Sequence, residues 1–483
     1  MGSEWVQLRD IVSIKGGKRL PKGESLQVDP NSHPYIRVRD MGSKYIPREG
    51  LEFVPDTVFP KIKNYIVNEN DVIISIVGTV GLVAVIDSFF DSASQTENCA
   101  KLSGLDALDA QYLYYCLVSP LGQREIAVQT VGAVQPKLPL YGIENITIPW
   151  PLRSIRESIV GCLGGLDNKI ALNRQINTTL ESMAQALFKS WFVDFDPVID
   201  NALAAGNEIP DELAARAARR EALHQQTNKT ANKTTGATDA DSPEQALPDT
   251  GLSDQRLPSE IQQLFPDRFV LTEEMGWVPE GWEVKPLSEA LYINPKVSIK
   301  KGAEATYVDM KALPTSGFMI DEAIKKEFAG GAKFKNRDVL LARITPCLEN
   351  GKTGLVDFLS DDEAGFGSTE FIVLREKGSI TMPFIAALSR HPEFRNHCVL
   401  NMVGSSGRQR VQNSCFDSYF VSTPTDSELL ELFDQVCYPY FTKMAKCRDE
   451  ALNLADLRDS LLPKLLSGQI TIPDAEQQLA EVL

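Results

Sequence analysis

The stretch "SIRESIVGCLGGLDNKIALNRQINTTLESMAQALFKSWF" (residues 154–192) decides the fold of this chain. Its apolar residues recur at alternating steps of four and three, which is the 3.5-residue repeat of a coiled-coil seam. The pattern predicts a helix of about 40 residues, roughly 60 Å long at 1.5 Å per residue. The seam residues expected to face a partner are Ile159, Leu163, Leu166, Ile170, Leu180 and Leu187.

A second helix with nearly the same pattern follows Pro424, and only Arg458 interrupts its seam. In the first helix, Asn173 and Asn177 lie on the seam, where buried polar residues cost stability and tend to fix register. Each helix could pack on its own domain, but their equivalent positions favour pairing with each other. The seam residues expected in the second helix are Phe433, Tyr440, Met444, Leu454 and Leu461.

An internal repeat of about 270 residues organises the rest of the chain. Six matched blocks occur in the same order, among them "NDVIISIVGTVGLVAVID" with "RDVLLARITPCLENGKTGLVDFL", and Thr96-Glu97 with Thr369-Glu370. Two loops close the series, "VGAVQPKL" (131–138) and "VGSSGRQR" (403–410). A repeat this long indicates a duplicated domain, and its short apolar runs with glycine-rich turns predict an α+β fold.

These patterns divide the chain into two modules, two long helices and the segments beside them. A Thr-, Asn-, Asp- and Pro-rich stretch at about 227–255 is interpreted as disordered linker. The predicted parts are modules 1–152 and 277–424, helices 153–200 and 425–470, a helical segment with polar linker at 201–276, and a C-terminal tail at 471–483.

The formal net charge of −16 argues against a nucleic-acid partner until its distribution is considered. Residues 1–152 hold 14 basic and 17 acidic side chains, and residues 277–424 hold 18 of each. Both modules are therefore nearly neutral and could carry local basic faces. No membrane span or secretory signal is expected, and eight scattered cysteines without paired spacing suggest reduced thiols in a cytoplasmic protein.

Signatures of enzymes and metal sites occur only as fragments. "PCLENGKTG" (346–354) ends like a phosphate-binding loop, but Pro346 replaces the first glycine and lacks the N–H that would hold phosphate. The four histidines match no zinc-ligand spacing, so no metal site is predicted. No nucleophile–base arrangement can be argued from spacing, so no catalytic residue is proposed and a binding protein is predicted.

The order module–helix–module–helix resembles the DNA-specificity subunit of Type I restriction–modification systems. The resemblance covers almost the whole chain, and polar residues around 227–255 look like a local insertion. The motifs that carry it are "QALFKSWFVDFDPV" (185–198), "GWVPEGWEV" (276–284), "DVLLARI" (338–344), "GSSGRQRV" (404–411) and "LRDSLLPKLLSGQI" (457–470).

This resemblance implies two target recognition domains, each reading one half of a bipartite double-stranded DNA site. It also implies that the two helices pair antiparallel as a spacer and as a dock for two methyltransferase subunits. Motor–endonuclease subunits would complete the complex in phage defence. Adenine methylation and cleavage, with S-adenosylmethionine, ATP and Mg, would belong to those partner chains, and this chain would be non-catalytic.

Candidate DNA-binding residues follow from the chemistry of base and phosphate recognition. Arg can bind guanine bidentately, Gln can read adenine, and Lys can contact phosphate. A solvated surface charge is the alternative for each one. The candidates are Lys15, Lys18, Arg19, Arg37, Arg39, Gln135 and Lys137 in the first module, and Lys333, Lys335, Arg343, Ser405, Ser406, Arg408, Gln409 and Arg410 in the second.

Two other functional classes stay open at this point. One is a single-chain methyltransferase–nuclease with degenerate motifs, which the lack of a cofactor loop disfavours. The other is a coiled-coil adaptor that binds only protein, which would not need duplicated basic loops. The aromatic stretch "LFKSWFVDF" (187–195) has two interpretations as well, a core segment or a surface for a partner subunit, and the core is slightly favoured.

Overall fold

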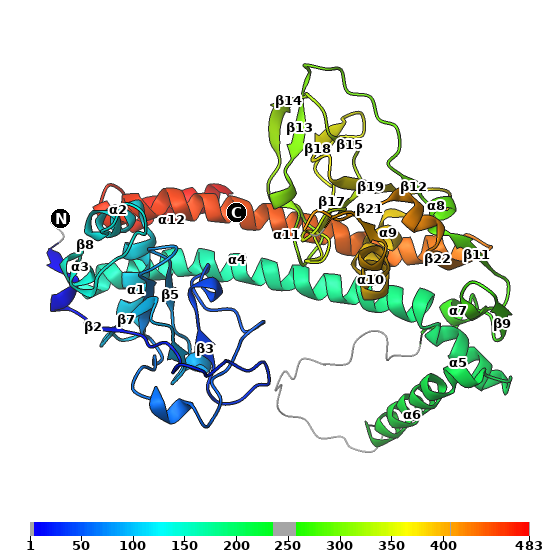
Figure 1. Ribbon diagram of the computed structural model, residues 1–483, viewed down its shortest axis with the longest axis horizontal. Coiled ribbons are helices and arrows are strands. Elements are labelled where there is room, and N and C mark those ends of the chain that lie inside the picture. Colours follow the sequence, from blue (N-terminus) through cyan, green and yellow to red (C-terminus); the bar gives the residue numbers. More distant parts are fainter. Residues whose placement is uncertain (1–3, 235–256, 406, 483) are drawn as a thin grey trace. The chain divides into compact units, whose positions relative to one another are not determined.

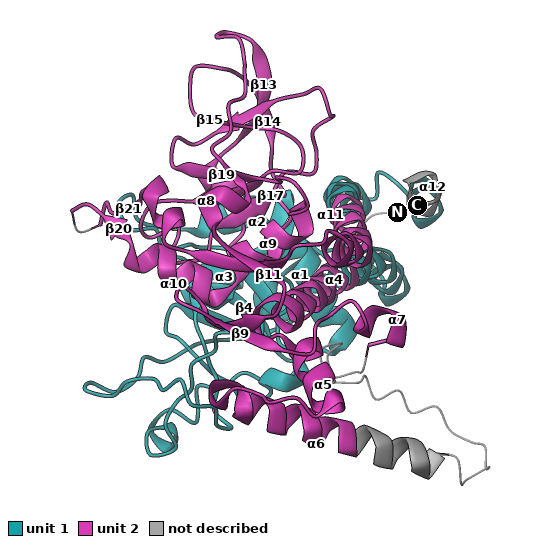
Figure 2. Cartoon of the chain, turned by 90° about the vertical axis from the view of Figure 1, so that its right-hand side faces the viewer, with its two compact units in different colours: residues 1–171, 452–483 teal, residues 172–451 magenta. Residues whose placement is uncertain are grey.

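The computed structural model describes residues 4–234, 257–405 and 407–482. The chain divides into two compact units, Met1–Ala171 with Leu452–Leu483, and Leu172–Ala451, which Figure 2 colours separately. Each unit holds one module of mixed helices and strands together with parts of two long helices. The predicted α+β class is confirmed.

A four-stranded antiparallel sheet of order β2-β7-β4-β5 forms the centre of the module in unit 1. β3 pairs in parallel with β6, and β1 pairs with β8, so the module begins and ends on neighbouring strands. The elements are β1 (Trp5–Gln7), β2 (Ser13–Gly16), β3 (Tyr35–Ile36), β4 (Val72–Ser75), β5 (Val83–Val85), β6 (Ser94–Gln95), β7 (Cys99–Ser103), α1 (Ala107–Val118), α2 (Pro120–Gln129), α3 (Leu140–Asn145) and β8 (Thr147–Pro149).

The module of unit 2 has the same strand order, β12-β19-β16-β17, with β13 parallel to β18 and β11 paired with β22. This shared topology shows that the two modules are copies of one fold, as the repeat predicts. The elements are β11 (Trp282–Pro286), α8 (Leu287–Ala290), β12 (Tyr292–Ile293), β13 (Glu304–Val308), β14 (Ile324–Glu327), β15 (Ala332–Phe334), β16 (Val339–Ala342), β17 (Thr353–Leu355), β18 (Gly365–Gly367), β19 (Phe371–Arg375), α9 (Met382–Arg390), α10 (Pro392–Leu400), β20 (Met402–Val403), β21 (Arg410–Val411) and β22 (Phe420–Pro424).

Strand pairing corrects one residue alignment of the repeat. The residue after β4 donates its N–H to the carbonyl of Asn98 (2.7 Å), and the residue after β16 donates to the carbonyl of Glu370 (3.0 Å). Glu370 is therefore equivalent to Asn98, and Thr369 to Glu97. The predicted match of Thr96-Glu97 with Thr369-Glu370 is wrong by one residue. Both modules contain a Thr-Glu pair, but the two pairs lie one residue apart in the fold.

Each module also contains a pair of helices joined at a proline. The sequence predicts a short helix that ends at this proline, and α1 and α9 do end just before it; Pro120 and Pro392 then begin the second helices, α2 and α10. Proline fits the first turn, because its fixed φ is helical and its missing N–H needs no partner there. The preceding Ser119 caps α2 by accepting a hydrogen bond from the N–H of Gly122 (3.1 Å).

The two long helices are α4 (Arg153–Phe188) and α11 (Glu428–Ser467), and they run antiparallel (Figure 1). In unit 1, Arg458 donates to Asp167 (2.9 Å); in unit 2, Asn173 donates to Glu450 (2.9 Å). The predicted antiparallel pairing of the helices is confirmed. The seam residues that are buried are Ile159, Leu163, Leu166, Ile170, Asn173, Leu187, Phe433, Met444, Leu454 and Leu461, whereas Leu180 and Tyr440 are half-buried.

The aromatic stretch at the end of α4 lies in the core of unit 2, in a π-helical turn, Lys189–Val193. Trp191 and Phe192 are almost completely buried, and Phe192 meets Phe384 and Phe433 edge-on at 5.1 Å. Aromatic pairs in this arrangement add to the stabilisation that comes from burial alone. The core interpretation of "LFKSWFVDF" therefore holds.

The segments between and after the modules contain more regular structure than the sequence indicates. Helix α6 continues to Thr234, into the residues predicted as linker, because extending an existing helix costs little per residue. A hairpin, β9–β10, occupies part of the predicted helix-and-linker segment, and the predicted tail contains α12. The remaining elements are α5 (Asp196–Ala205), α6 (Asp211–Thr234), α7 (Ser259–Gln262), β9 (Phe269–Thr272), β10 (Gly276–Pro279) and α12 (Ile472–Val482).

Among the described residues, no helix is long and apolar enough to cross a membrane, and no group of three or more His, Cys, Asp or Glu could hold a metal ion. The cysteines are all free thiols, and most are buried. Burial raises the pKa of the Cys116 thiol to about 12, so this thiol stays protonated and unreactive at neutral pH.

Candidate nucleic-acid interface

The two repeated loops occupy equivalent positions in their modules. Leu138 donates its N–H to the carbonyl of Ile76, and Val411 donates to the carbonyl of Arg343, both at 2.9 Å. Lys137 is therefore equivalent to Arg410, each one residue before the anchoring N–H. Sequence comparison instead aligns Leu138 with Arg410, because the second loop is one residue longer than the first.

Glycine is required at the start of each loop, after the bridge residue Val131 in the first and after β20 in the second. Gly132 and Gly404 have positive φ values of 95° and 136°. A Cβ atom on Gly132 would lie 2.7 Å from the carbonyl oxygen of Gln135, a distance that real Cβ atoms do not show. The glycine that follows Val in both loops is therefore required by the backbone conformation.

Between these fixed ends the two loops present different side chains to solvent. The first loop exposes Gln135 and Lys137, with the side chain of Val134 99% exposed at its tip. In the second, Ser405 and Arg408 are exposed and Gln409 is half-buried, whereas Ser406 lies outside the described residues. The fold therefore keeps the loop ends constant while the chemistry between them varies.

Arg410 is held by Glu370 through a bidentate ion pair. Its Nε donates to both carboxylate oxygens (3.0 and 2.9 Å), and Nη2 donates to Oε1 (2.7 Å). These hydrogen bonds hold the pKa of the Glu370 carboxyl below its ordinary value, so the pair is fully charged at neutral pH. Any contact between Arg410 and a base or phosphate must compete with Glu370.

A similar ion pair joins Arg19 to Glu97 in the first module, with Nε 2.6 Å from Oε1. Burial opposes ionisation of Glu97, but hydrogen bonds led by that from Arg19 outweigh it and lower the carboxyl pKa. Arg19 keeps 81% of its side chain exposed, so its outer face stays accessible. Lys15 and Lys18 are exposed on the same segment, and Lys18 lies 5.4 Å from the ring centre of Tyr65.

Gly17, between these lysines, allows a close approach of two chain segments. A Cβ atom there would lie 2.1 Å from the carbonyl oxygen of Thr96. From sequence, Gly16-Gly17 could be interpreted as a simple turn. Gly17 has no positive φ, however, and is needed because the backbone of Thr96 passes too close to leave room for a side chain. Its role is to seat the basic segment on β6.

Two candidate arginines of the first module are bound by acids of that module. Arg37, with 20% of its side chain exposed, forms ion pairs with Asp40 and Glu52. Arg39 is more exposed and lies 3.4 Å from the same Glu52. Both arginines therefore link the chain between β3 and the Glu52 segment, and Arg39 keeps 60% of its side chain exposed.

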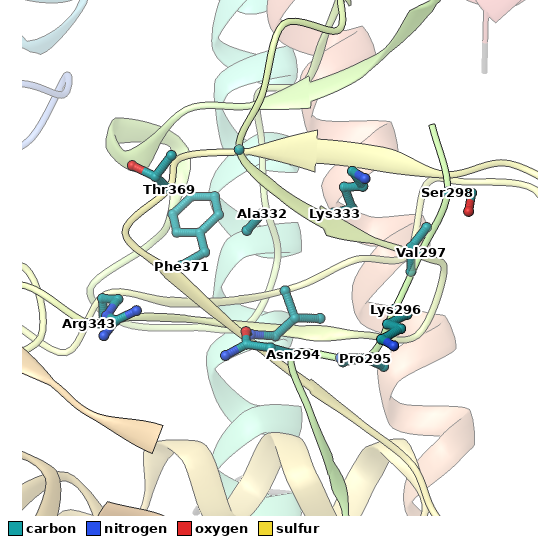
Figure 3. Close-up of a pocket in the computed structure, with 12 residues that line it drawn as sticks. Asn294, Pro295, Lys296, Val297, Ser298, Ala332, Lys333, Arg343, Thr369 and Phe371 are labelled. Atoms are coloured by element: carbon teal, nitrogen blue, oxygen red, sulfur yellow. The ribbon is translucent and has the colours of Figure 1, made fainter. Parts of the chain in front are cut away.

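In unit 2, a hollow of about 600 Å³ brings together two candidates, Lys333 and Arg343 (Figure 3). Lys335 does not line it; its N–H instead donates to the buried Asp338 carboxylate (2.7 Å) in the turn before β16. Lys296 lines the hollow and was missed from sequence, although "NPKVSIKKG" shows a basic run directly after a strand. The lining residues are Asn294, Pro295, Lys296, Val297, Ser298, Gly331, Ala332, Lys333, Arg343, Thr369, Phe371 and Val373.

Comparison with known proteins gives one consistent result. Residues 2–182 match the family model described as "Type I restriction modification DNA specificity domain". The chain is 26% identical over 347 residues to the Type I restriction enzyme HindI specificity subunit of Haemophilus influenzae, which covers 69% of this chain and 71% of the relative. It is 19% identical over 482 residues to the MjaIX specificity subunit of Methanocaldococcus jannaschii, which covers 97% and 93%.

Solved structures give a similar but weaker match. A crystal structure of the Type I restriction–modification S subunit from M. genitalium covers 96% of both chains at 14% identity, with a TM-score of 0.48.

Proposed function

Because this chain is a relative of Type I restriction enzyme specificity subunits and its residues 2–182 match their DNA specificity domain, we propose that it directs a restriction–modification complex to an asymmetric, bipartite DNA site. The observation that carries the proposal is the pair of modules with one strand topology and different loop chemistry. Each module would read one half-site, and the chain itself would catalyse neither methylation nor cleavage.

Duplication within one chain explains why the site would be asymmetric. Two identical half-site readers related by symmetry bind palindromic sites. Here the equivalent loop positions differ, with Gln135 and Lys137 in one module and Arg408, Gln409 and Arg410 in the other. Amide and guanidinium groups discriminate bases by different hydrogen-bond patterns in the major groove, so the half-sites would differ in sequence.

The long helices would set the spacing between the half-sites. A helix of 40 residues, the length of α11, spans about 60 Å at 1.5 Å per residue. At about 3.4 Å per base pair this limits the separation to roughly 18 base pairs. The spacing would be shorter, because the modules occupy part of that length.

The partners in this proposal are double-stranded DNA, two methyltransferase subunits and motor–endonuclease subunits. S-adenosylmethionine, ATP and Mg would be bound by those partner chains, and the complex would act on DNA in the cytoplasm. The helix pair α4–α11 would dock the methyltransferase subunits.

Mapping of methylated adenines in genomic DNA tests the proposal directly. Genomes from a host that retains the partner subunits would be compared with and without the gene for this chain. We expect loss of methylation at one bipartite motif, and unchanged methylation everywhere would contradict the proposal. Robust methyl transfer by the purified chain alone would favour a single-chain methyltransferase, and failure to bind any DNA would favour a protein-binding adaptor.

Glu370→Gln is expected to increase the affinity of the chain for DNA of unrelated sequence. The substitution removes the charge that holds Arg410, so the guanidinium becomes available to a phosphate. Each additional phosphate contact steepens the dependence of log K on log salt by about 0.9. Because the folded-state pKa of Glu370 is depressed, the ion pair is present above the ordinary carboxyl pKa and is lost only as pH falls below it. Fluorescence anisotropy with a labelled duplex at several salt concentrations measures the affinity and its salt dependence.

The matched control is Glu363→Gln, which releases Lys325 of the same module from a similar ion pair. If Glu370→Gln instead weakens binding as strongly as Arg410→Ala, then Glu370 positions Arg410 for DNA and does not withhold it.

A further inference from the structure

The hollow in unit 2 has an unusual charge for a chain that is acidic overall. Three basic residues line it, Lys296, Lys333 and Arg343, and none of the described lining residues is acidic. Figure 3 shows Arg343 on one side of the hollow, with Lys296 and Lys333 on the other. The formal net charge of the chain is −16, so the hollow is locally opposite in charge to the chain as a whole and would attract an anion.

The carboxylate of Glu370 interacts electrostatically with Arg343, but its main partner is Arg410. Glu370 follows the lining residue Thr369 in sequence, but its two oxygens accept hydrogen bonds from Arg410. Arg343 is fixed at the edge of the hollow by donating from Nη2 to the carbonyl of Val411 (2.8 Å). Its Nε is buried and has no hydrogen-bond partner among the described residues. A buried donor without a partner costs free energy.

Apolar residues lie between the basic ones. Figure 3 places Ala332 and Phe371 between Arg343 and Lys333, and Val297 beside Lys333. The ammonium group of Lys333 lies 5.2 Å from the ring centre of Phe328, a residue outside the hollow. Cations on two sides of an apolar surface are complementary to a nucleic-acid strand, in which charged phosphates alternate with the apolar faces of the sugars.

The first module is different at the equivalent position. Thr369 is equivalent to Glu97, which forms an ion pair with Arg19. A carboxylate therefore stands in the first module where the second has a neutral hydroxyl. The two modules therefore differ in charge at this one position.

We propose that this hollow holds the sugar-phosphate backbone of one DNA strand beside the half-site that the β20–β21 loop reads. The inference rests on the proposed function and adds to it a division of roles. Arg343, Lys296 and Lys333 would bind phosphates without reading sequence, and the adjacent loop would contact base edges. The two surfaces are continuous, because Ile344 and Arg410 form a β-bridge next to Arg343.

Thr369→Glu tests the proposal by placing in the hollow the acid that the first module carries at this position. Thr369 and Lys296 are exposed, so Thr369→Glu and Lys296→Ala should leave the fold intact. We expect each substitution to weaken binding of the full chain to any duplex by about tenfold, the scale of a charged hydrogen bond. The salt dependence of log K should become shallower by about 0.9.

Thr369→Gln, with the same size as Glu but no charge, and Lys300→Ala, an exposed lysine that does not line the hollow, are the controls and should bind like wild type. The methylated motif should keep its sequence in every variant, since phosphate contacts carry no base information. An unchanged salt dependence in both Thr369→Glu and Lys296→Ala would overturn the proposal, as would a change in the bases of the motif.

Free nucleotides distinguish the DNA backbone from a small-molecule ligand. Calorimetry with ATP and with inorganic pyrophosphate should show no saturable binding, and tight binding of either that Thr369→Glu abolishes would assign the hollow to a nucleotide or free phosphate instead. If wild type itself binds no DNA, the proposed function fails. If wild type binds DNA and the hollow variants do so equally well, only the role of the hollow fails.

Discussion

Replacing residues 282–424 by the corresponding module of another specificity subunit is expected to change one half of the methylated motif and leave the other half intact. The exchange is geometrically possible because the module begins and ends on paired strands, with Trp282 opposite Pro424 in the β11–β22 register. Each mismatched base pair costs about 1–3 kcal/mol in specific binding, so a change of several bases removes recognition of the original half-site. Methylation mapping reads the two halves and the spacing separately.

A smaller graft provides the control for this exchange. Moving only residues 404–409 alters the exposed loop but keeps the sheet, the helices α9 and α10 and the basic hollow. We expect the graft to change fewer base positions in the same half-site. A module exchange that altered both halves, or that changed the spacing alone, would contradict the assignment of one half-site to one module.

The architecture could be predicted because its signals are periodic or repeated. The 3.5-residue pattern of residues 154–192 specifies a long helix with one buried stripe, and the buried residues Leu163 and Ile170 lie on it. The duplication could be found because six blocks keep their order. Neither inference requires knowing which distant residues touch.

Details of the candidate interface depend on contacts that sequence spacing does not reveal. Arg410 and its partner Glu370 are 40 positions apart, and Arg19 and Glu97 are 78 apart. A basic residue in a loop looks the same in sequence whether a carboxylate holds it or solvent surrounds it. The hollow was missed for the same reason, because Lys296 and Arg343 come together only when β12, β16 and β19 form one sheet.

Trp191→Ala is expected to lower the free energy of unfolding of unit 2 by about 3–5 kcal/mol, the usual cost of truncating a large buried aromatic side chain. Trp191 is 2% exposed and meets Phe265 edge-on at 5.2 Å and Phe433 at 5.9 Å. The substitution leaves a cavity where the end of α4 packs against α11 and removes these aromatic contacts. Hydrogen exchange of the backbone amides in α9, which belongs to the same core, measures the loss as a fall in opening free energy.

Trp5→Ala is the matched control, because it removes the same side chain from a position that is 56% exposed in unit 1. Substitutions of exposed residues usually change stability by less than about 0.5 kcal/mol, so amide protection in both units should stay close to wild type. Equal losses for the two variants would mean that Trp191 does not contribute through burial. A loss at Trp191 that appeared only when methyltransferase subunits were bound would instead assign the aromatic stretch to a partner interface, since a core residue stabilises the free chain as well.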